Sequence, residues 1–164
     1  MKVLLDYPTE EEEFVIVERV AATLDHAAPV VTTESLAALQ AECRKNYIDP
    51  SLVQYAVRIA SATRDPEARG IGDLGHYIAF GASPRATIHI VEAARALSFL
   101  RGRDYAIPQD VIDVIPDVLR HRIVLSYEAI SDALTSDQII HRIMNHIPAP
   151  DKPLESHVNF DAES

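Results

Sequence analysis

The sequence has a single cysteine, Cys43, among its 164 residues, and it has no tryptophan. One thiol excludes an intrachain disulfide framework and a zinc site built from several cysteines. Cys43 follows Leu36 and Leu39 at helical spacing, and Tyr47 continues the same predicted helical face. We therefore expect it to lie on the apolar side of a helix as a buried, unreactive thiol.

The sequence also lacks any apolar run that approaches the ~20 residues needed to cross a bilayer. Its N-terminal segment is acidic and has neither the basic region nor the apolar core of a signal peptide. These two absences predict a cytoplasmic protein without a membrane span.

Positive charge is scarce overall, because 15 Lys and Arg stand against 25 Asp and Glu, giving a net charge of −10 and a pI near 5.0. A strongly acidic chain is a poor partner for nucleic acid or for an anionic membrane surface. Several arginines nevertheless fall between Arg85 and Arg122. We expect no nucleic-acid partner, but we do expect a local basic cluster.

The motifs of self-sufficient enzymes are missing as well. The sequence contains no phosphate-binding loop ending in Lys-Ser or Lys-Thr, no Gly-x-Ser-x-Gly, no His-Glu-x-x-His and no dinucleotide fingerprint. The seven histidines are scattered, and neither they nor Asp110, Asp113 and Asp117 suggest a metal site or a catalytic partner. The chain alone is expected to hold no catalytic residue and no metal.

Helical periodicity is the dominant pattern, and N-terminal caps mark several of the helix starts. Thr9 with Glu12 and Thr135 with Gln138 have the spacing of capping boxes, and Thr33 and Asp49 are predicted as N-caps. The predicted helices cover about 9–25, a segment starting at Thr33, a segment opened by Asp49-Pro50, about 84–101, 108–115, 117–123 after a break at Pro116, and a last helix starting at Thr135 and ending near Ile147. The first three predict an antiparallel bundle. The 84–101 helix is apolar almost all round, with Ile88, Val91, Ala94, Leu97 and Leu100, which predicts a central position, and Gly102 is expected to end it.

These elements predict an all-α fold, a multi-helix bundle over residues 9–147. Residues 1–8 contain Val3-Leu4-Leu5, which we interpret as a strand remnant or linker from a preceding domain. Residues 64–81 hold four of the five glycines and predict an irregular connection. Residues 148–164 are polar and proline-rich, so we expect a flexible, disordered tail.

Arg85 stands in the first turn of the predicted 84–101 helix, behind Ser83 as N-cap and Pro84 as first helical residue. The helix dipole favours anions at this end, so a cation here is unfavourable by ~0.3–1 kcal/mol. A shared anion such as phosphate, bound by Arg85 and the free N–H groups of that turn, would resolve the conflict. Pairing of Arg85 with a nearby carboxylate would resolve it equally well.

Five blocks of sequence form a distinctive series: Gly81-Ala82-Ser83-Pro84-Arg85-Ala86, Ala93-Ala94-Arg95-Ala96, Gly102-Arg103-Asp104-Tyr105, Pro108-x-Asp110-Val111 and Val118-Leu119-x-His121-Arg122-Ile123. Tyr7-Pro8 and Ala62-Thr63-Arg64 precede them. In order and spacing this series resembles the C-terminal region of MoxR-type AAA+ ATPases, over about residues 3–147. The resemblance implies a helical AAA+ lid that follows an α/β nucleotide-binding core.

The resemblance also implies roles for individual residues. Arg85 matches the family's sensor 2 arginine, which reaches the terminal phosphates of ATP, with Ser83 and Pro84 in support. Arg120 and Arg122 are weaker candidates for the same basic surface, and pairing with helix carboxylates explains each of them as well. Ile107 stands where the family more often has a capping residue, so the sequence departs from the family pattern at the start of the helix that Pro108 opens.

The family further implies ATP and Mg in the full-length protein, a ring homo-oligomer, and a client protein that the sequence does not identify. We expect the Walker motifs, sensor 1 and arginine finger in a core before residue 1, so the chain alone should not hydrolyse ATP. Two other hypotheses remain: a free-standing helical adaptor that binds proteins without nucleotide, and a helix-turn-helix nucleic-acid binder, which the net charge disfavours.

Overall fold

A computed structural model describes residues 1–22 and 28–151 of the chain. The end of the first predicted helix beyond residue 22, and the predicted tail from residue 152 onward, lie outside the described residues. The chain divides into two compact units, which are considered separately: Val3–Glu42, and Met1–Lys2 together with the chain from Cys43 onward.

The smaller unit holds α1 (Glu10–Ala22) and all but the last residue of α2 (Thr33–Cys43). The capping box predicted at the start of α1 is confirmed, since the Thr9 N–H donates to the Glu12 carboxylate at 2.9 Å and the Glu12 N–H donates to Thr9 Oγ1 at 3.3 Å. The cap of α2 is Thr32 and not Thr33, because Thr32 Oγ1 accepts from the Ser35 N–H. The apolar run 3–5 forms no strand.

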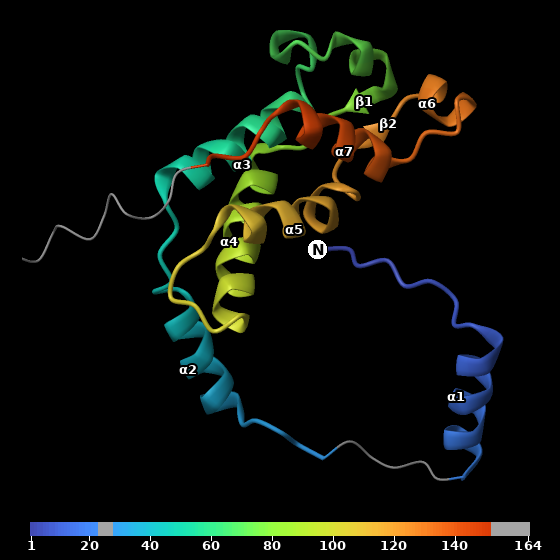
Figure 1. Cartoon of the computed structure of the whole chain (residues 1–164), viewed down its shortest axis with the longest axis vertical. Coiled ribbons are helices and arrows are strands. Elements are labelled where there is room, and N and C mark those ends of the chain that lie inside the picture. The colour runs from blue at the N-terminus through green and yellow to red at the C-terminus, as the bar shows by residue number, and fades with distance from the viewer. Residues whose placement is uncertain (23–27, 152–164) are drawn as a thin grey trace, which may run out of the picture. The chain divides into compact units, whose positions relative to one another are not determined.

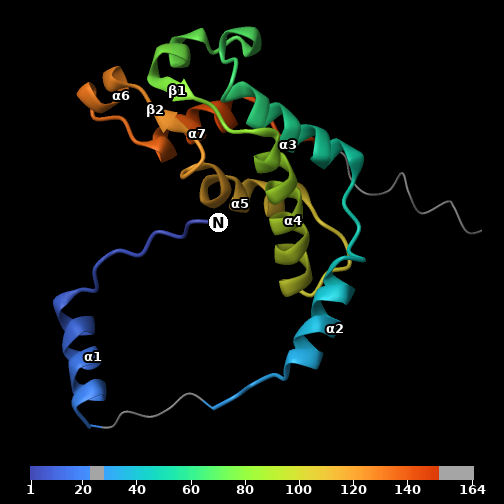
Figure 2. The same cartoon turned by 180° about the vertical axis from the view of Figure 1, so that it is seen from behind.

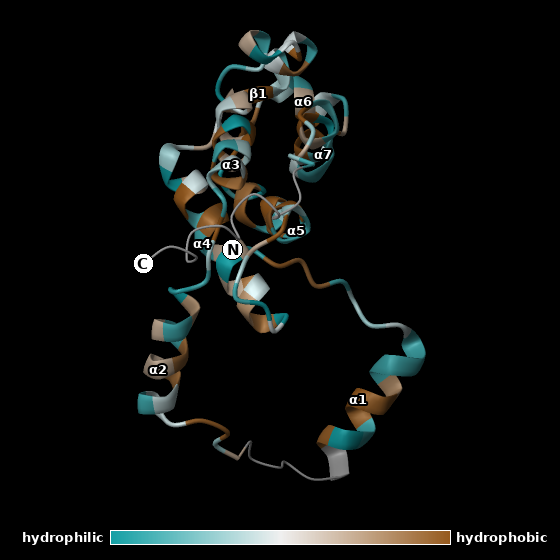
Figure 3. Cartoon of the chain, turned by 60° about the vertical axis from the view of Figure 1, so that its left-hand side comes forward, coloured by the Kyte–Doolittle hydropathy of each residue, from teal (hydrophilic) through white to brown (hydrophobic). Residues whose placement is uncertain are grey.

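The predicted antiparallel bundle of the first three helices is wrong, because the described side chains of α1 are exposed and α2 buries none. α3 (Pro50–Ala62) belongs to the larger unit and packs against α4 (Pro84–Leu100), α5 (Pro108–Leu119) and α7 (Ser136–His146). No residue of α2 is buried, and Cys43 is only half-buried. Tyr47, expected on the same helical face as Cys43, lies beyond the end of α2. The residues in the middle of α1 are apolar (Figure 3), yet they are exposed.

The larger unit is built from helices that cross one another around a single core (Figures 1 and 2). Its buried side chains come from all four long helices and include Tyr55, Ile59, Ile90, Ile115, Leu119, Ile139, Ile140 and Ile143. The predicted caps at two helix starts are confirmed: Asp49 Oδ1 accepts from the Ser51 N–H at 2.7 Å, and Thr135 forms a capping box with Gln138. The all-α fold predicted from periodicity is therefore confirmed.

Helix α4 packs through a narrower stripe than its sequence suggests. Its buried residues are Ala86, Ile90, Ala94 and Ser98, spaced four apart. Ile88 and Leu100, which helical periodicity placed in the core, are 56% and 80% exposed. Three of the four buried side chains are small, and small side chains let a neighbouring helix approach closely. Gly102, with φ of 72°, ends α4 as predicted.

The break predicted at Pro116 is wrong, because α5 runs through it to Leu119. A proline inside a helix removes one backbone hydrogen bond and disfavours the turn before it. Here only three helical residues follow Pro116, and Val111, Val114, Ile115, Val118 and Leu119 are all buried. Their burial outweighs the local cost of the proline.

The glycine-rich connection contains more order than predicted. It holds two 3₁₀ helices, η1 (Glu67–Arg69) and η2 (Gly72–Tyr77), and a short strand, β1 (Ile78–Phe80). β1 pairs antiparallel with β2 (Val124–Leu125), a partner more than 40 residues away, and β2 leads into α6 (Tyr127–Ser131). Strands of two or three residues carry too little periodicity to be recognised from sequence.

Candidate functional site

Arg85 lies in the first turn of α4, as predicted, and its side chain is exposed. Within residues 1–22 and 28–151 it makes no hydrogen bond and no ion pair. Pro84 is the first helical residue, and Ser83 has the extended backbone of an N-cap. The Ser83 hydroxyl, however, makes no capping hydrogen bond, contrary to the expected serine cap. A free cation and an uncapped helix end therefore lie together.

The segment before Ser83 lies against the C-terminal end of α3. Thr63 Oγ1 accepts from the Ala82 N–H at 2.9 Å, and Arg64 Nη1 donates to the Ala82 carbonyl at 2.7 Å. At Gly81 the backbones come so close that a Cβ would lie 2.3 Å from the Thr63 carbonyl oxygen. Thr63 and Arg64 belong to the Ala-Thr-Arg block noted in the sequence, but the sequence did not indicate this contact.

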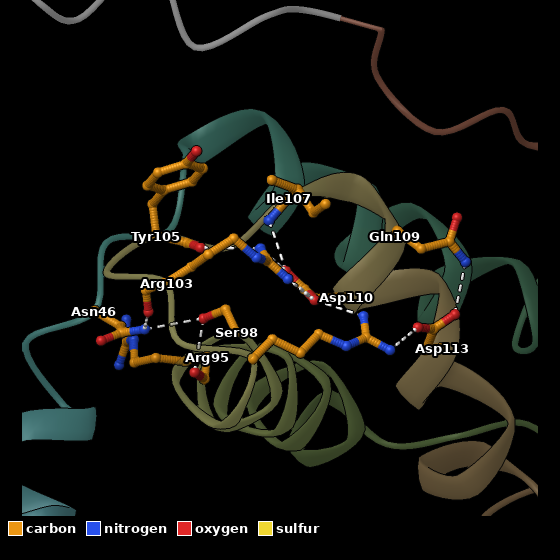
Figure 4. Close-up of polar contacts among 10 residues, drawn as sticks. Asn46, Arg95, Ser98, Arg103, Tyr105, Ile107, Gln109, Asp110 and Asp113 are labelled. Carbon is orange, nitrogen blue, oxygen red and sulfur yellow. Dashed lines mark hydrogen bonds and ion pairs between the residues drawn. The ribbon is translucent and has the colours of Figure 1, made fainter.

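The opposite end of α4 is held by a buried carboxylate. Asp110 is fully buried, accepts from Arg101 Nη1 at 2.8 Å, and accepts from both terminal nitrogens of Arg103 at 2.7 Å each (Figure 4). It also accepts from the Ile107 N–H at 2.8 Å, which ties down the start of α5 where Ile107 itself cannot cap. Arg101 reaches on to Asp113 at 2.5 Å.

These contacts decide the charge state of Asp110. Burial by itself would raise the pKa of this carboxyl, but the hydrogen bonds from Arg103, the Ile107 N–H and Arg101 outweigh burial and lower its pKa below the usual value. Sequence reasoning found no partner for Asp110 or Asp113. The structure shows that arginines at the end of α4 and just after it are their partners, so both carboxylates hold α4 against α5.

A second buried contact secures the same end of the helix. The Asn46 side-chain amide donates to Ser98 Oγ at 3.0 Å and to the Arg103 carbonyl at 2.6 Å (Figure 4). The Ser98 hydroxyl in turn donates to the Arg95 carbonyl at 2.8 Å. Together with the contacts of Asp110, this contact fixes the C-terminal end of α4. The N-terminal end of α4 is held by the contacts around Ala82.

The two weaker candidates, Arg120 and Arg122, are placed differently from Arg85. Arg120 is ion-paired with Asp117 and, at 3.0 Å, with Asp137, as the carboxylate-pairing alternative expected. For Arg122 that alternative is wrong within the described residues: its guanidinium pairs with no carboxylate there, but donates to the Val118 carbonyl at 2.6 Å and contacts the His121 ring. Both guanidinium groups are engaged within the fold, whereas Arg85 is not.

No group of three or more His, Cys, Asp or Glu side chains among the described residues could hold a metal ion. None of the helices in the described ranges combines the length and apolar character needed to cross a membrane.

Comparison with known proteins gives a consistent result. Residues 75–143 match the family model of the AAA lid domain. The chain is 46% identical over 149 residues to the chaperone MoxR1 of Mycobacterium tuberculosis, covering 91% of this chain and 40% of that protein. It is 37% identical over 110 residues to the protein MoxR of Paracoccus denitrificans, covering 63% of this chain and 32% of that protein.

The fold has a counterpart among solved structures. A crystal structure of a candidate ATPase from Cytophaga hutchinsonii ATCC 33406 superimposes with a TM-score of 0.85 at 33% identity, over 92% of this chain and 46% of that one. The chain thus spans less than half the length of the relatives that it matches.

Proposed function

The chain belongs to the MoxR family of AAA+ ATPases and carries its lid domain, and on that premise we propose that the lid senses bound ATP through Arg85. The guanidinium acts as the sensor 2 group: it contacts the terminal phosphates and couples hydrolysis to movement of the lid. That movement drives a chaperone-like remodelling of a partner protein. One relative is itself named a chaperone.

The observation that carries the proposal is the unsatisfied state of Arg85. A first-turn cation is disfavoured by the helix dipole, and an intramolecular carboxylate is the usual remedy. No carboxylate of the described residues pairs with Arg85, although Arg101, Arg103, Arg120 and Arg142 each pair with at least one. An exposed, unpaired guanidinium is suited to charge-assisted, bidentate contacts with phosphate oxygens.

The remaining parts of an ATPase are proposed for the rest of the protein. ATP and Mg would be bound mainly by an α/β core outside these 164 residues, which is consistent with the greater length of the relatives. We propose a cytoplasmic ring of identical subunits, as the family suggests. The present chain would contribute a guanidinium and the N-terminal end of α4, which complete the site but do not make one by themselves.

Removal of the guanidinium from the full-length protein tests the proposal. Contacts to a terminal phosphate strengthen as charge develops in the transition state, so Arg85→Ala should lower kcat on the order of tenfold or more and change KM for ATP much less. Folding should persist, because a cation that opposes the helix dipole is removed.

Arg58→Ala is the matched control, because Arg58 is also an exposed helical arginine and has no assigned role. It should leave kcat within about twofold of the unsubstituted protein, a surface substitution of small effect. Unchanged hydrolysis in Arg85→Ala, measured with the protein shown to be folded by circular dichroism, would refute the sensor role.

A further inference from the structure

The end of α3 holds both backbone polar groups of Ala82, three residues before Arg85. The Thr63 hydroxyl donates its hydrogen to the Ala60 carbonyl at 2.7 Å. The same oxygen accepts a hydrogen bond from the Ala82 N–H at 2.9 Å. Thr63 is 1% exposed, and Ala82 is fully buried. A buried hydroxyl with both its hydrogen and a lone pair engaged has a fixed orientation.

Arg64 completes the contact from the next position along the chain. Its Nη1 donates to the Ala82 carbonyl at 2.7 Å, while the residue as a whole is exposed. A guanidinium that donates to a backbone carbonyl positions that carbonyl through a charge-assisted hydrogen bond. Thr63 and Arg64, the two residues that directly follow α3, thus hold the N–H and the C=O of Ala82.

The chain between Ala82 and Arg85 has little freedom to absorb a displacement. Pro84 restricts its own φ, and the Ala86 N–H donates to the Ser83 carbonyl at 2.8 Å. Ala86, one residue beyond Arg85, is fully buried in the core. A shift at Ala82 would therefore be passed on to the backbone of Arg85.

From this geometry we propose that Thr63 and Arg64 are positioning residues for Arg85, holding the start of α4 where its guanidinium meets the terminal phosphates. The proposal rests on the sensor role of Arg85 proposed above. It assigns a function to the Ala62-Thr63-Arg64 block, whereas the sensor role of Arg85 by itself assigns none to these residues. Neither residue needs to touch nucleotide, so each acts on turnover only through Arg85.

The test is a double-mutant cycle in the full-length protein, with kcat and KM for ATP measured separately. Thr63→Val removes the hydroxyl and keeps the shape, and it should lower kcat on the order of tenfold with a smaller change in KM, because small misplacements of a catalytic group cost one to two orders of magnitude. Thr63→Ser restores the hydroxyl and should recover kcat to within about threefold. Ser61→Ala, a hydroxyl deletion on the same helix away from Ala82, is the control and should leave kcat unchanged.

The decisive readout is dependence on Arg85. In an Arg85→Ala background, neither Thr63→Val nor Arg64→Ala should lower kcat further, because the group that they position is gone. Equal fold losses in both backgrounds would mean a general structural role and would overturn the proposal. A loss with Arg85→Ala but none with either positioning variant would overturn the proposal while leaving the sensor role intact. No loss with Arg85→Ala would overturn the sensor role and, with it, the positioning role.

Arg64→Ala covers the case in which Thr63→Val does not fold. Arg64 is exposed, so its truncation should leave the α3–α4 core intact. The kcat of Arg64→Ala, measured with Arg85 present and in the Arg85→Ala background, is then sufficient to test the positioning role. Amide exchange supplies a readout independent of ATP: in the 164-residue chain, the Ala82 N–H should exchange faster in Thr63→Val than in the unsubstituted chain. Equal exchange rates would show that the hydroxyl does not hold this amide and would overturn the proposal.

Discussion

A methyl group added at Gly81 would test the close approach of the α4 entry to the end of α3. In Gly81→Ala the new Cβ would lie 2.3 Å from the Thr63 carbonyl oxygen, 2.5 Å from the Thr63 carbonyl carbon and 2.7 Å from the Arg64 Cα. All three atoms are backbone atoms, which cannot rotate away as a side chain can. The two segments must therefore separate by about 1 Å to reach ordinary contact.

The cost follows from overpacking together with the hydrogen bonds that the separation weakens. Overpacking a close contact costs ~1–3 kcal/mol, and a typical hydrogen bond contributes ~1 kcal/mol. With the two bonds to Ala82 strained, we expect the free energy of unfolding to fall by about 2–4 kcal/mol. At ~2–4 °C per kcal/mol for a domain of this size, the melting temperature should fall on the order of 4–16 °C.

Thermal denaturation followed by far-UV circular dichroism measures this shift, and Gly75→Ala is the matched control. A Cβ at Gly75 would meet its nearest neighbour, Glu67 Oε1, at 3.9 Å, which is ordinary contact with a flexible side chain. The control should melt within about 2 °C of the unsubstituted chain. If Gly81→Ala melts as close to the unsubstituted chain as the control does, the reasoning from the close approach is refuted.

Two further predictions concern the buried carboxylate and the isolated chain. Because hydrogen bonding holds the pKa of Asp110 below the unfolded value of ~3.9, its stabilisation is present above that pH and is lost as the pH falls through the folded pKa. Asp110→Asn should lower the free energy of unfolding by about 2–3 kcal/mol at pH 7 and flatten its decline below about pH 4, as urea denaturation at several pH values would show; an unaltered acid profile would contradict this. The 164-residue chain alone should not hydrolyse ATP, and phosphate release that persists through repurification would contradict that expectation.

Several local structures could be predicted because their causes lie within a few residues of sequence. The capping boxes at Thr9 and Thr135, the Asp49-Pro50 helix start and the end of α4 at Gly102 all depend on neighbouring residues. The placement of Arg85 in the first turn of α4 has the same origin. Short-range chemistry was sufficient for each of them.

Pro116 and α4 show where local reasoning fails. A proline predicts a break, but burial of the surrounding face of α5 keeps the helix continuous. In α4, the apolar residues Ile88 and Leu100 are exposed, while Ser98 is buried because Asn46 supplies its partner from a distant segment. In both cases the deciding contacts join residues far apart in sequence, so the pattern of one helix could not reveal them.

The sequence by itself determined the all-α class, most helix starts, and the presence of an arginine where the helix dipole disfavours one. Only the tertiary structure decided which arginines are free. Packing brings Asp110 to Arg101 and Arg103 and brings Asp137 to Arg120, and it brings no carboxylate of the described residues to Arg85. The structure alone also joined the end of α3 to Ala82. Charge and helix propensity are properties of a residue and its neighbours in sequence, whereas the ion pairs and hydrogen bonds between distant residues depend on how the helices pack.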